Sequence, residues 1–198
     1  MKRPNLLLFD LGGVLVENVC FERLNKLLPS NLSNTEIKSK WLASSIVREF
    51  ELGITSPQIF ATRLIEEWCL PLDVSTFLAE FATWPKAFYP GAIELLKQLR
   101  QQYTVACLSN SNAIHWQRFN GFREYFHLSL SSHLLGFIKP DSACLVRALH
   151  ECGEDADATI FFDDSLENVY SARKLGIRAF HVCGLDEVER VLRENSLL

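Results

Sequence analysis

Five short apolar runs constrain the fold of this chain more than any other feature. Apolar runs of this length without polar alternation are typical of strands buried on both faces of a parallel sheet. They lie at residues 6–9, 104–108, 127–130, 159–162 and 178–182, and polar or charged residues end most of them. Helical patterns with apolar residues three and four apart follow at 91–102, 142–151 and 166–175. The alternation predicts an α/β fold, a doubly wound parallel sheet covered on both faces.

The interval between the first two runs is too long for a simple crossover. Residues 10–103 lie there, whereas a crossover needs only about a dozen residues. Amphipathic helical segments occur within it at 21–28, 36–52, 57–68 and 74–81. Ser56 and Pro57 fit a helix start, and Gly53 fits a helix end. We therefore expect a small all-helical cap at 19–86, inserted into a catalytic core of 1–18 and 87–198, with hinges at 16–19 and 83–90.

The composition argues against several kinds of partner. The 198 residues carry 24 acidic and 20 basic side chains, a net charge of −4, and no long basic run. We therefore expect neither nucleic acid nor an anionic membrane surface as a partner. No apolar stretch approaches the ~18 residues that a spanning helix needs. The six cysteines form no C-x-x-C pair, which is typical of reduced thiols and predicts a cytoplasmic protein. The oligomeric state is not predicted.

Polar and charged residues gather where the predicted strands end. In an open parallel sheet, ligands bind beyond the carboxyl ends of the strands. Three carboxylates, a hydroxyl, an amide and an ammonium stand at or near these places: Asp10, Ser109, Asn110, Lys139, Asp163 and Asp164. Each has an ordinary structural explanation when taken alone, such as a turn, a helix cap or a solvated charge. Together they predict a divalent metal, a small-anion site and a nucleophile.

Short motifs around these residues resemble those of the haloacid dehalogenase-like (HAD) hydrolases. Four motifs occur in the order of that family, at residues 9–14, 108–110, 139–140 and 161–165. The helical segment in the first connection, Glu51-x-Gly53-x-Thr55, and residues 163–168 resemble a subgroup of the family. That subgroup contains bacterial glucose-1-phosphate phosphatases and the phosphatase domain of soluble epoxide hydrolases. The resemblance implies a HAD-like core with a helical cap and phosphatase activity.

The resemblance also implies a nucleophile and a metal. Asp10 would attack phosphorus in line and form an aspartyl-phosphate, which water then hydrolyses. Mg²⁺ would be held by Asp10, the backbone carbonyl of Gly12, and one or both of Asp163 and Asp164. Because neighbouring side chains of a strand point to opposite faces, only one member of the Asp163–Asp164 pair need bind the metal directly. Asn168 is a candidate for supporting this pair.

The anion site implied by the resemblance combines one charge with several hydrogen-bond donors. Lys139 would place a positive charge on the phosphoryl oxygens. Ser109 and the backbone N–H groups of Leu11, Gly12 and Asn110 would complete the site. The bound partner would be a small phosphorylated metabolite, with sugar phosphates favoured. In the cap, Arg48 and Glu49 are candidates for contact with the sugar.

One position departs from the family pattern. Most HAD phosphatases carry a second aspartate two residues after the nucleophile, as general acid and base, and here Gly12 stands there. Such catalysis is worth about 10²- to 10⁴-fold in rate. Three alternatives remain: a substrate with a better leaving group, Glu17 as the proton donor, or a weak or inactive relative. At the level of function, the alternatives to a phosphatase are a silent phospho-ligand-binding protein and a metal-free haloacid dehalogenase.

Overall fold

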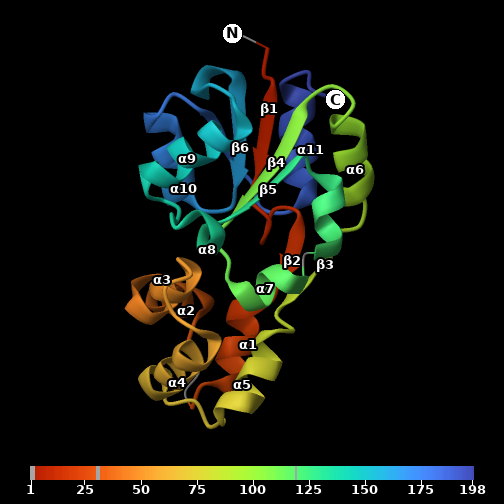
Figure 1. The fold of residues 1–198 in the computed structure, drawn as a ribbon. Coiled ribbons are helices and arrows are strands. Elements are labelled where there is room, and N and C mark those ends of the chain that lie inside the picture. Colours follow the sequence, from red (N-terminus) through yellow and green to blue (C-terminus); the bar gives the residue numbers. More distant parts are fainter. Residues whose placement is uncertain (1–2, 30–31, 119) are drawn as a thin grey trace.

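The core is built on one parallel sheet, as expected. The computed structural model describes residues 3–29, 32–118 and 120–198. The sheet strands are β1 (Leu6–Phe9), β4 (Thr104–Ser109), β5 (Leu128–Ser131), β6 (Thr159–Asp163) and β7 (Arg178–His181). They pair in the order β5-β4-β1-β6-β7, and every pair is parallel. The strand order reverses beside β1, so the predicted doubly wound α/β fold is confirmed (Figure 1).

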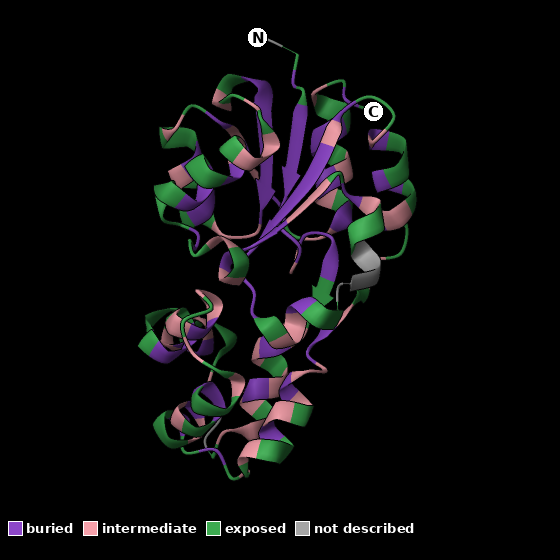
Figure 2. Cartoon of the chain, viewed as in Figure 1, coloured by how far each residue is buried: buried purple, intermediate pink, exposed green. Residues whose placement is uncertain are grey.

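Helices cover both faces of the sheet. One face packs against α6 (Ala92–Leu99) and α11 (Leu185–Glu194), and the other against α9 (Ser142–Cys152) and α10 (Leu166–Lys174). Along β1, Leu7 and Phe9 face the first pair of helices, whereas Leu6 and Leu8 face the second. All four side chains are fully buried, which explains why this strand is apolar without alternation. Figure 2 shows the sheet as the most buried layer of the molecule.

In the described part of residues 19–86, five helices share one apolar cluster. The helices are α1 (Cys20–Leu27), α2 (Asn34–Ala43), α3 (Ser45–Glu51), α4 (Pro57–Trp68) and α5 (Val74–Phe81). Their buried side chains form a cluster rich in aromatic rings, separate from the two clusters that flank the sheet. Ser56 caps α4 by accepting a hydrogen bond from Ile59 N–H, and Pro57 occupies its first turn. Gly53 has a φ of +73° after the end of α3, as a helix-ending glycine does.

The prediction of one helix over residues 36–52 was wrong. Two helices form instead, because Ser44 leaves the helical conformation with φ −73° and ψ 118°. Its hydroxyl accepts a hydrogen bond from Val47 N–H and donates one to Glu67. Serine competes with the helix for backbone hydrogen bonds, so it favours a cap over a helix interior. The break lets α3 begin anew and bury its own side chains in the apolar cluster of the cap.

The segments expected to act as hinges pair with each other. β2 (Val16–Asn18) and β3 (Pro85–Phe88) form a two-stranded antiparallel ribbon between the cap helices and the core (Figure 1). Four short helices complete the chain: α7 (Ala113–Arg118), η1 (Asn120–Tyr125), α8 (Ser132–Leu135) and η2 (Ala156–Ala158). Within the described ranges, no helix combines the length and the apolar character that a bilayer crossing requires.

Candidate active site

Three carboxylates meet at the carboxyl edge of the sheet. Asp10 directly follows β1, and Asp163 and Asp164 come at the end of β6. The register pairs Phe9 with Phe162, and Asp10 continues the ladder by donating its N–H to the Phe162 carbonyl over 2.8 Å. One oxygen of each carboxylate lies within 4.8 Å of the others. The pairing of β1 with β6 therefore brings together residues that are far apart in the sequence.

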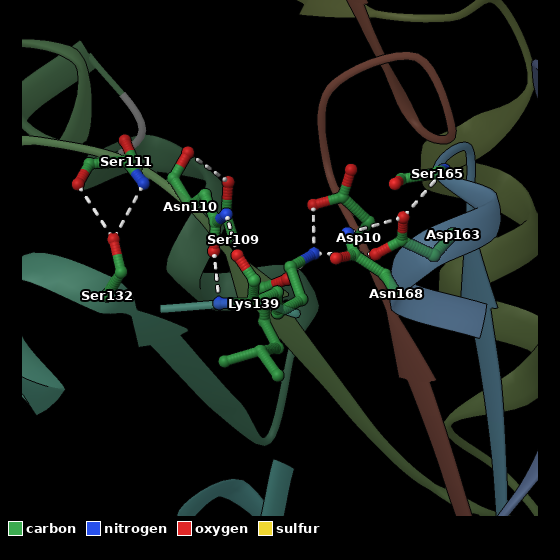
Figure 3. A network of polar contacts seen from close by, with 10 residues as sticks. Asp10, Ser109, Asn110, Ser111, Ser132, Lys139, Asp163, Ser165 and Asn168 are labelled. Carbon is green, nitrogen blue, oxygen red and sulfur yellow. Dashed lines mark hydrogen bonds and ion pairs between the residues drawn. The ribbon is translucent and has the colours of Figure 1, made fainter. Parts of the chain in front are cut away.

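Lys139 connects two of these carboxylates (Figure 3). Its Nζ donates to Asp10 over 2.9 Å, to Asp163 over 2.7 Å and to the Leu108 carbonyl over 2.9 Å. The side chain of Lys139 is 1 % exposed and that of Asp163 is fully buried. All three ammonium protons therefore have partners. Lys139 could therefore donate to a further group only by exchanging one of these hydrogen bonds.

Burial and like charge shift the ionisation of the site. Burial raises the pKa of Asp10 to about 7, a net value that includes the opposing effect of Lys139 and the smaller raising effects of Asp163 and Asp164. Burial also raises the pKa of Asp164. For Lys139, burial alone would lower the pKa, but Asp10 and Asp163 hold it above its ordinary value. With all four groups ionised, three negative charges and one positive charge leave a net charge of −2, which a divalent cation would neutralise.

Hydrogen bonds hold Lys139 and Asp163 in position beside Asp10. Asn110 donates to the carbonyl of Lys139 over 2.9 Å and accepts from its N–H over 3.0 Å. Asp163 accepts from Ser165 N–H over 2.8 Å and from Asn168 over 2.9 Å. Asn168 thus contacts the acidic pair, as we expected. Since the oxygens of Asp163 accept from Lys139 as well, Asp164 is the more open member of the pair.

Glycines allow the loop after β1 to pass close to other groups. Gly13 has a φ of +77°, and a Cβ atom built there would lie 2.9 Å from Oδ2 of Asp164. A Cβ atom on Gly12 would lie 3.0 Å from Nδ2 of Asn18. Asn18, on β2, therefore fills the space beside Gly12 that a side chain at position 12 would need. No sequence signal pointed to Asn18.

A pocket of about 380 Å³ opens above the carboxylates, between the core and the cap helices. Among the residues predicted to bind the metal or the anion, six line it: Asp10, Gly12, Ser109, Asn110, Lys139 and Asp164. Two others, Leu11 and Asp163, are buried beside it. The volume falls in the range of small-molecule sites. The core therefore supplies a charged floor, and the cap supplies the opposite wall.

Of the two cap residues expected to contact the sugar, one lines the pocket and the other does not. Arg48 lines it and forms an ion pair with Asp141. Glu49 pairs with Arg63 and is not among the lining residues, and Glu17 is exposed and also absent from the lining. The pocket wall includes two residues that sequence reasoning did not single out for chemistry, Lys38 and Glu51. Glu51 is the first residue of the Glu51-x-Gly53-x-Thr55 motif, which was used only to identify a subgroup of the family and not to assign a chemical role.

His115 packs at the junction between the core and the cap. Its ring stacks on Phe81 with centroids 4.0 Å apart, and Nε2 lies 2.9 Å from the Phe81 carbonyl. Nδ1 lies 3.3 Å from the side-chain amide of Asn112, so a neutral ring with its proton on Nε2 satisfies both contacts. Trp116 is buried in the core cluster. These contacts indicate a packing role for both residues.

A parallel α/β sheet with an acidic, lysine-bearing site at its carboxyl edge is suited to hydrolytic chemistry on an anionic substrate. The model of the haloacid dehalogenase-like hydrolase family matches residues 4–176. The chain therefore belongs to this family, and the predicted relationship is confirmed.

Two curated relatives are phosphatases. The chain is 25% identical over 189 residues to the phosphoglycolate phosphatase of Nitrosococcus oceani, covering 87% of this chain and 81% of that protein. It is 27% identical over 188 residues to a sesquiterpene phosphatase of Aspergillus oryzae, covering 88% of each chain. These relatives and the family support the predicted enzyme class, a HAD-type phosphoric monoester hydrolase.

A solved HAD family enzyme from Bacteroides thetaiotaomicron has the same fold. Its magnesium complex superposes with a TM-score of 0.80 at 25% identity, covering 97% of this chain and all of that chain. Its complex with magnesium and inorganic phosphate gives a TM-score of 0.73 at 26% identity, covering 89% and 93%. A relative of the same architecture thus holds both a divalent metal and a phosphate.

Proposed function

We propose that this protein is a magnesium-dependent phosphatase that hydrolyses a small phosphorylated metabolite through an aspartyl-phosphate on Asp10. The observation that carries the proposal is the cluster of Asp10, Asp163 and Asp164, joined to Lys139, on the floor of a pocket. Oδ1 of Asp10 is held by Lys139. Such a carboxylate is placed to attack a phosphorus atom that enters from the pocket.

Electrostatics explains why this floor needs cations. A carboxylate about 3.5 Å from a phosphate dianion meets a repulsion of roughly 9 kcal/mol at an effective dielectric constant of 20. Lys139 offsets part of it, and its charge is maintained by two carboxylates. The carboxylate oxygens of the cluster are donors that Mg²⁺ prefers. Bound Mg²⁺ would supply charge neutralisation and orientation of the phosphoryl oxygens.

We assign different tasks to the two neighbouring aspartates. Asp164 lines the pocket and would bind the metal directly, together with Asp10 and the backbone carbonyl of Gly12. Asp163 is fully buried and accepts from Lys139, Ser165 and Asn168, so it would position Lys139 beside the metal site. This arrangement agrees with the alternation of side chains at the end of a strand.

The remaining floor residues are suited to the phosphoryl oxygens. The Ser109 hydroxyl lines the pocket, and its closest partner is the Asn110 carbonyl at 3.5 Å, so it is available to donate to a ligand. The N–H groups of Leu11, Gly12 and Asn110 belong to the two loops that follow β1 and β4. We propose that these donors bind the phosphoryl group, as oriented amides bind anions elsewhere.

The cap would select the substrate. Residues 19–86 would form this unit, and 1–18 with 87–198 the catalytic core. Lys38, Arg48 and Glu51 give its wall the polar groups that a hydroxylated ligand needs, so we favour a sugar phosphate. Contact of the cap with the core excludes water from the reacting group. All six cysteines are free thiols, which supports a cytoplasmic location.

The test begins with p-nitrophenyl phosphate and the wild-type protein. We expect hydrolysis that EDTA abolishes and Mg²⁺ restores, and that disappears in Asp10→Asn. Hydrolysis that persists in EDTA contradicts the metal dependence, and release of halide from a 2-haloacid without metal favours the dehalogenase alternative. Binding of phosphate without turnover favours a silent binding protein. A panel of sugar phosphates, phosphoglycolate and a terpenyl phosphate then identifies the substrate class.

A further inference from the structure

The place of the family's usual acid is filled by a group that does not titrate. Gly12 has no side chain, and the Asn18 amide lies where one would begin. Oδ1 of Asn18 accepts a hydrogen bond from Cys20 N–H over 3.0 Å, which fixes the amide in place. An amide does not exchange a proton with an alcohol near neutral pH. A proton for the leaving group must therefore come from another side chain of the pocket.

Most ionisable groups around the pocket are engaged elsewhere or have the wrong charge. Lys38 and Arg48 are basic side chains, and Lys139 donates all its protons within the floor. His115 is neutral and hydrogen-bonded at both ring nitrogens. Glu167 is exposed and accepts from Ser165. Of the pocket-lining acids outside the proposed metal site, this leaves Glu51 in the described part of the chain.

Glu51 is held against the core by its own backbone. The Ser132 hydroxyl lies 2.6 Å from the Glu51 carbonyl and accepts from Ser111 N–H over 3.0 Å. Two residues later, a Cβ atom on Gly53 would lie only 2.5 Å from the backbone oxygen of His133. The end of α3 thus contacts α8 and the loop after β4 closely. These contacts anchor the end of α3 on the core, and Glu51 lines the same pocket as Asp10.

The surroundings of Glu51 keep its carboxyl group near the midpoint of ionisation. Burial raises the pKa of Glu51 to about 7, while a hydrogen bond from Trp41 and the charges of Lys139 and Arg48 act in the opposite direction. The titratable or charged groups on the elements around it include Cys20, Lys38, Arg48, His133 and Lys139. A group that titrates near the working pH is suited to both donating and accepting a proton.

We infer that Glu51 is the general acid and base of this site and takes over the task of the missing side chain at position 12. The inference rests on the proposed phosphatase function. In an in-line displacement the leaving oxygen lies opposite the attacking Asp10, on the cap side of phosphorus, and α3 is the cap helix that brings an acid to this pocket.

The proposed steps are balanced in protons and charge. Asp10 forms a bond to phosphorus, the bond from phosphorus to the ester oxygen breaks, and the Glu51 carboxyl transfers its proton to that oxygen. An alcohol, an aspartyl-phosphate and a Glu51 carboxylate result. Water then attacks phosphorus, the bond between phosphorus and the Asp10 oxygen breaks, and the water gives one proton to Glu51. The oxygen of the water remains on the released hydrogen phosphate. Asp10 is again a carboxylate, and Glu51 is again protonated.

The decisive variant is Glu51→Gln, because the amide matches the size of the protonated carboxyl group. On an alkyl phosphate we expect kcat to fall by about 10²- to 10³-fold. On p-nitrophenyl phosphate, whose leaving group needs no acid, we expect a burst of one p-nitrophenolate per active site followed by slow turnover. The high-pH limb of wild-type kcat/KM on the alkyl phosphate should be absent in the variant.

Glu49→Gln is the matched control, since Glu49 lies on the same helix, pairs with Arg63 and does not line the pocket. It should change neither rate nor pH profile. Unchanged kcat in Glu51→Gln overturns the inference, and so does an equal loss on both substrates without a burst. Should Glu51→Gln not fold, Glu51→Asp replaces it, with a shifted limb and reduced kcat expected. A wild type that hydrolyses no phosphate contradicts the proposed function itself.

Discussion

The core and the cap are held together by different chemistry. Among the described polar residues that are buried as a whole, Ser44 alone lies in the cap, where Glu51 is half-buried at the pocket, whereas the core buries Asp10, Asp163 and Lys139. The interior of the cap consists of apolar and aromatic groups, with Phe50 stacked on Phe60 at 4.1 Å. The core therefore buries charged side chains at one edge of its sheet, where apolar groups would otherwise pack. The cap, with its apolar interior, forms the opposite wall of the pocket.

This difference predicts different responses to substitution. Removing a charge from the core leaves opposite charges buried without compensation, and this cost depends on metal and pH. Removing an aromatic ring from the cap leaves a cavity, and this cost is insensitive to both. Substitutions in the two regions should therefore differ in how their effect on stability responds to Mg²⁺ and pH.

The largest effect is expected for Lys139→Met, which leaves Asp10 and Asp163 without their shared cation. At pH 8 in EDTA we expect the free energy of unfolding to fall by about 5 kcal/mol, as for a broken buried ion pair. Added Mg²⁺ should restore part of the loss, because a cation binds the folded state. Urea denaturation with and without Mg²⁺ measures both effects. Lys174→Met, at an exposed lysine of α10, is the control and should change little.

In the cap, Phe60→Ala should lower stability by about 4 kcal/mol through cavity formation. Phe60 is fully buried and contacts three aromatic rings. Three of the four tryptophans belong to the cap cluster, so tryptophan fluorescence reports mainly on the cap. We expect the fluorescence midpoint in urea to fall regardless of Mg²⁺. A loss that Mg²⁺ reverses would show that the cap and the charged floor are one energetic unit.

His115 predicts a pH dependence at the junction of the two regions. Burial lowers its pKa to about 4 from the ordinary 6.5, so the unfolded chain binds this proton more readily than the folded chain. The stabilisation is complete above pH 6.5 and is lost as the pH falls toward 4, by about 3 kcal/mol in total. His115→Gln should flatten this part of the stability profile. An unchanged profile would contradict the assigned neutral ring.

The smallest effect is expected for the ion pair that joins the cap to the core. Arg48 and Asp141 are about half exposed, at 49% and 50% of their side-chain surface. A double-mutant cycle with Arg48→Gln and Asp141→Asn should give a coupling of about 0.5 kcal/mol, reduced by salt. A coupling above 2 kcal/mol would show that charge, in addition to packing, fixes the cap on the core.

More of the structure of the core than of the cap was predicted from the sequence. The register of β1 with β6 follows from two apolar runs, each ending at an aspartate, so the meeting of Asp10 and Asp163 was predictable. The break at Ser44 was missed because buried residues about three or four apart continue across it, from Ile37 and Trp41 to Val47 and Phe50. The ribbon of β2 and β3 was missed because each strand is short and gains its partner from the far end of the cap.

The sequence by itself determined the strands, the order of the motifs and the charges at the strand ends, because these depend on local pattern and on the parallel sheet. Only the tertiary structure decided which cap side chains face the floor. Helical periodicity shows that α3 has a buried side, but Glu51 reaches the pocket because Ser44 restarts the helix and Ser132 and Gly53 seat its end on the core. Such long-range contacts leave no periodic trace in the chain.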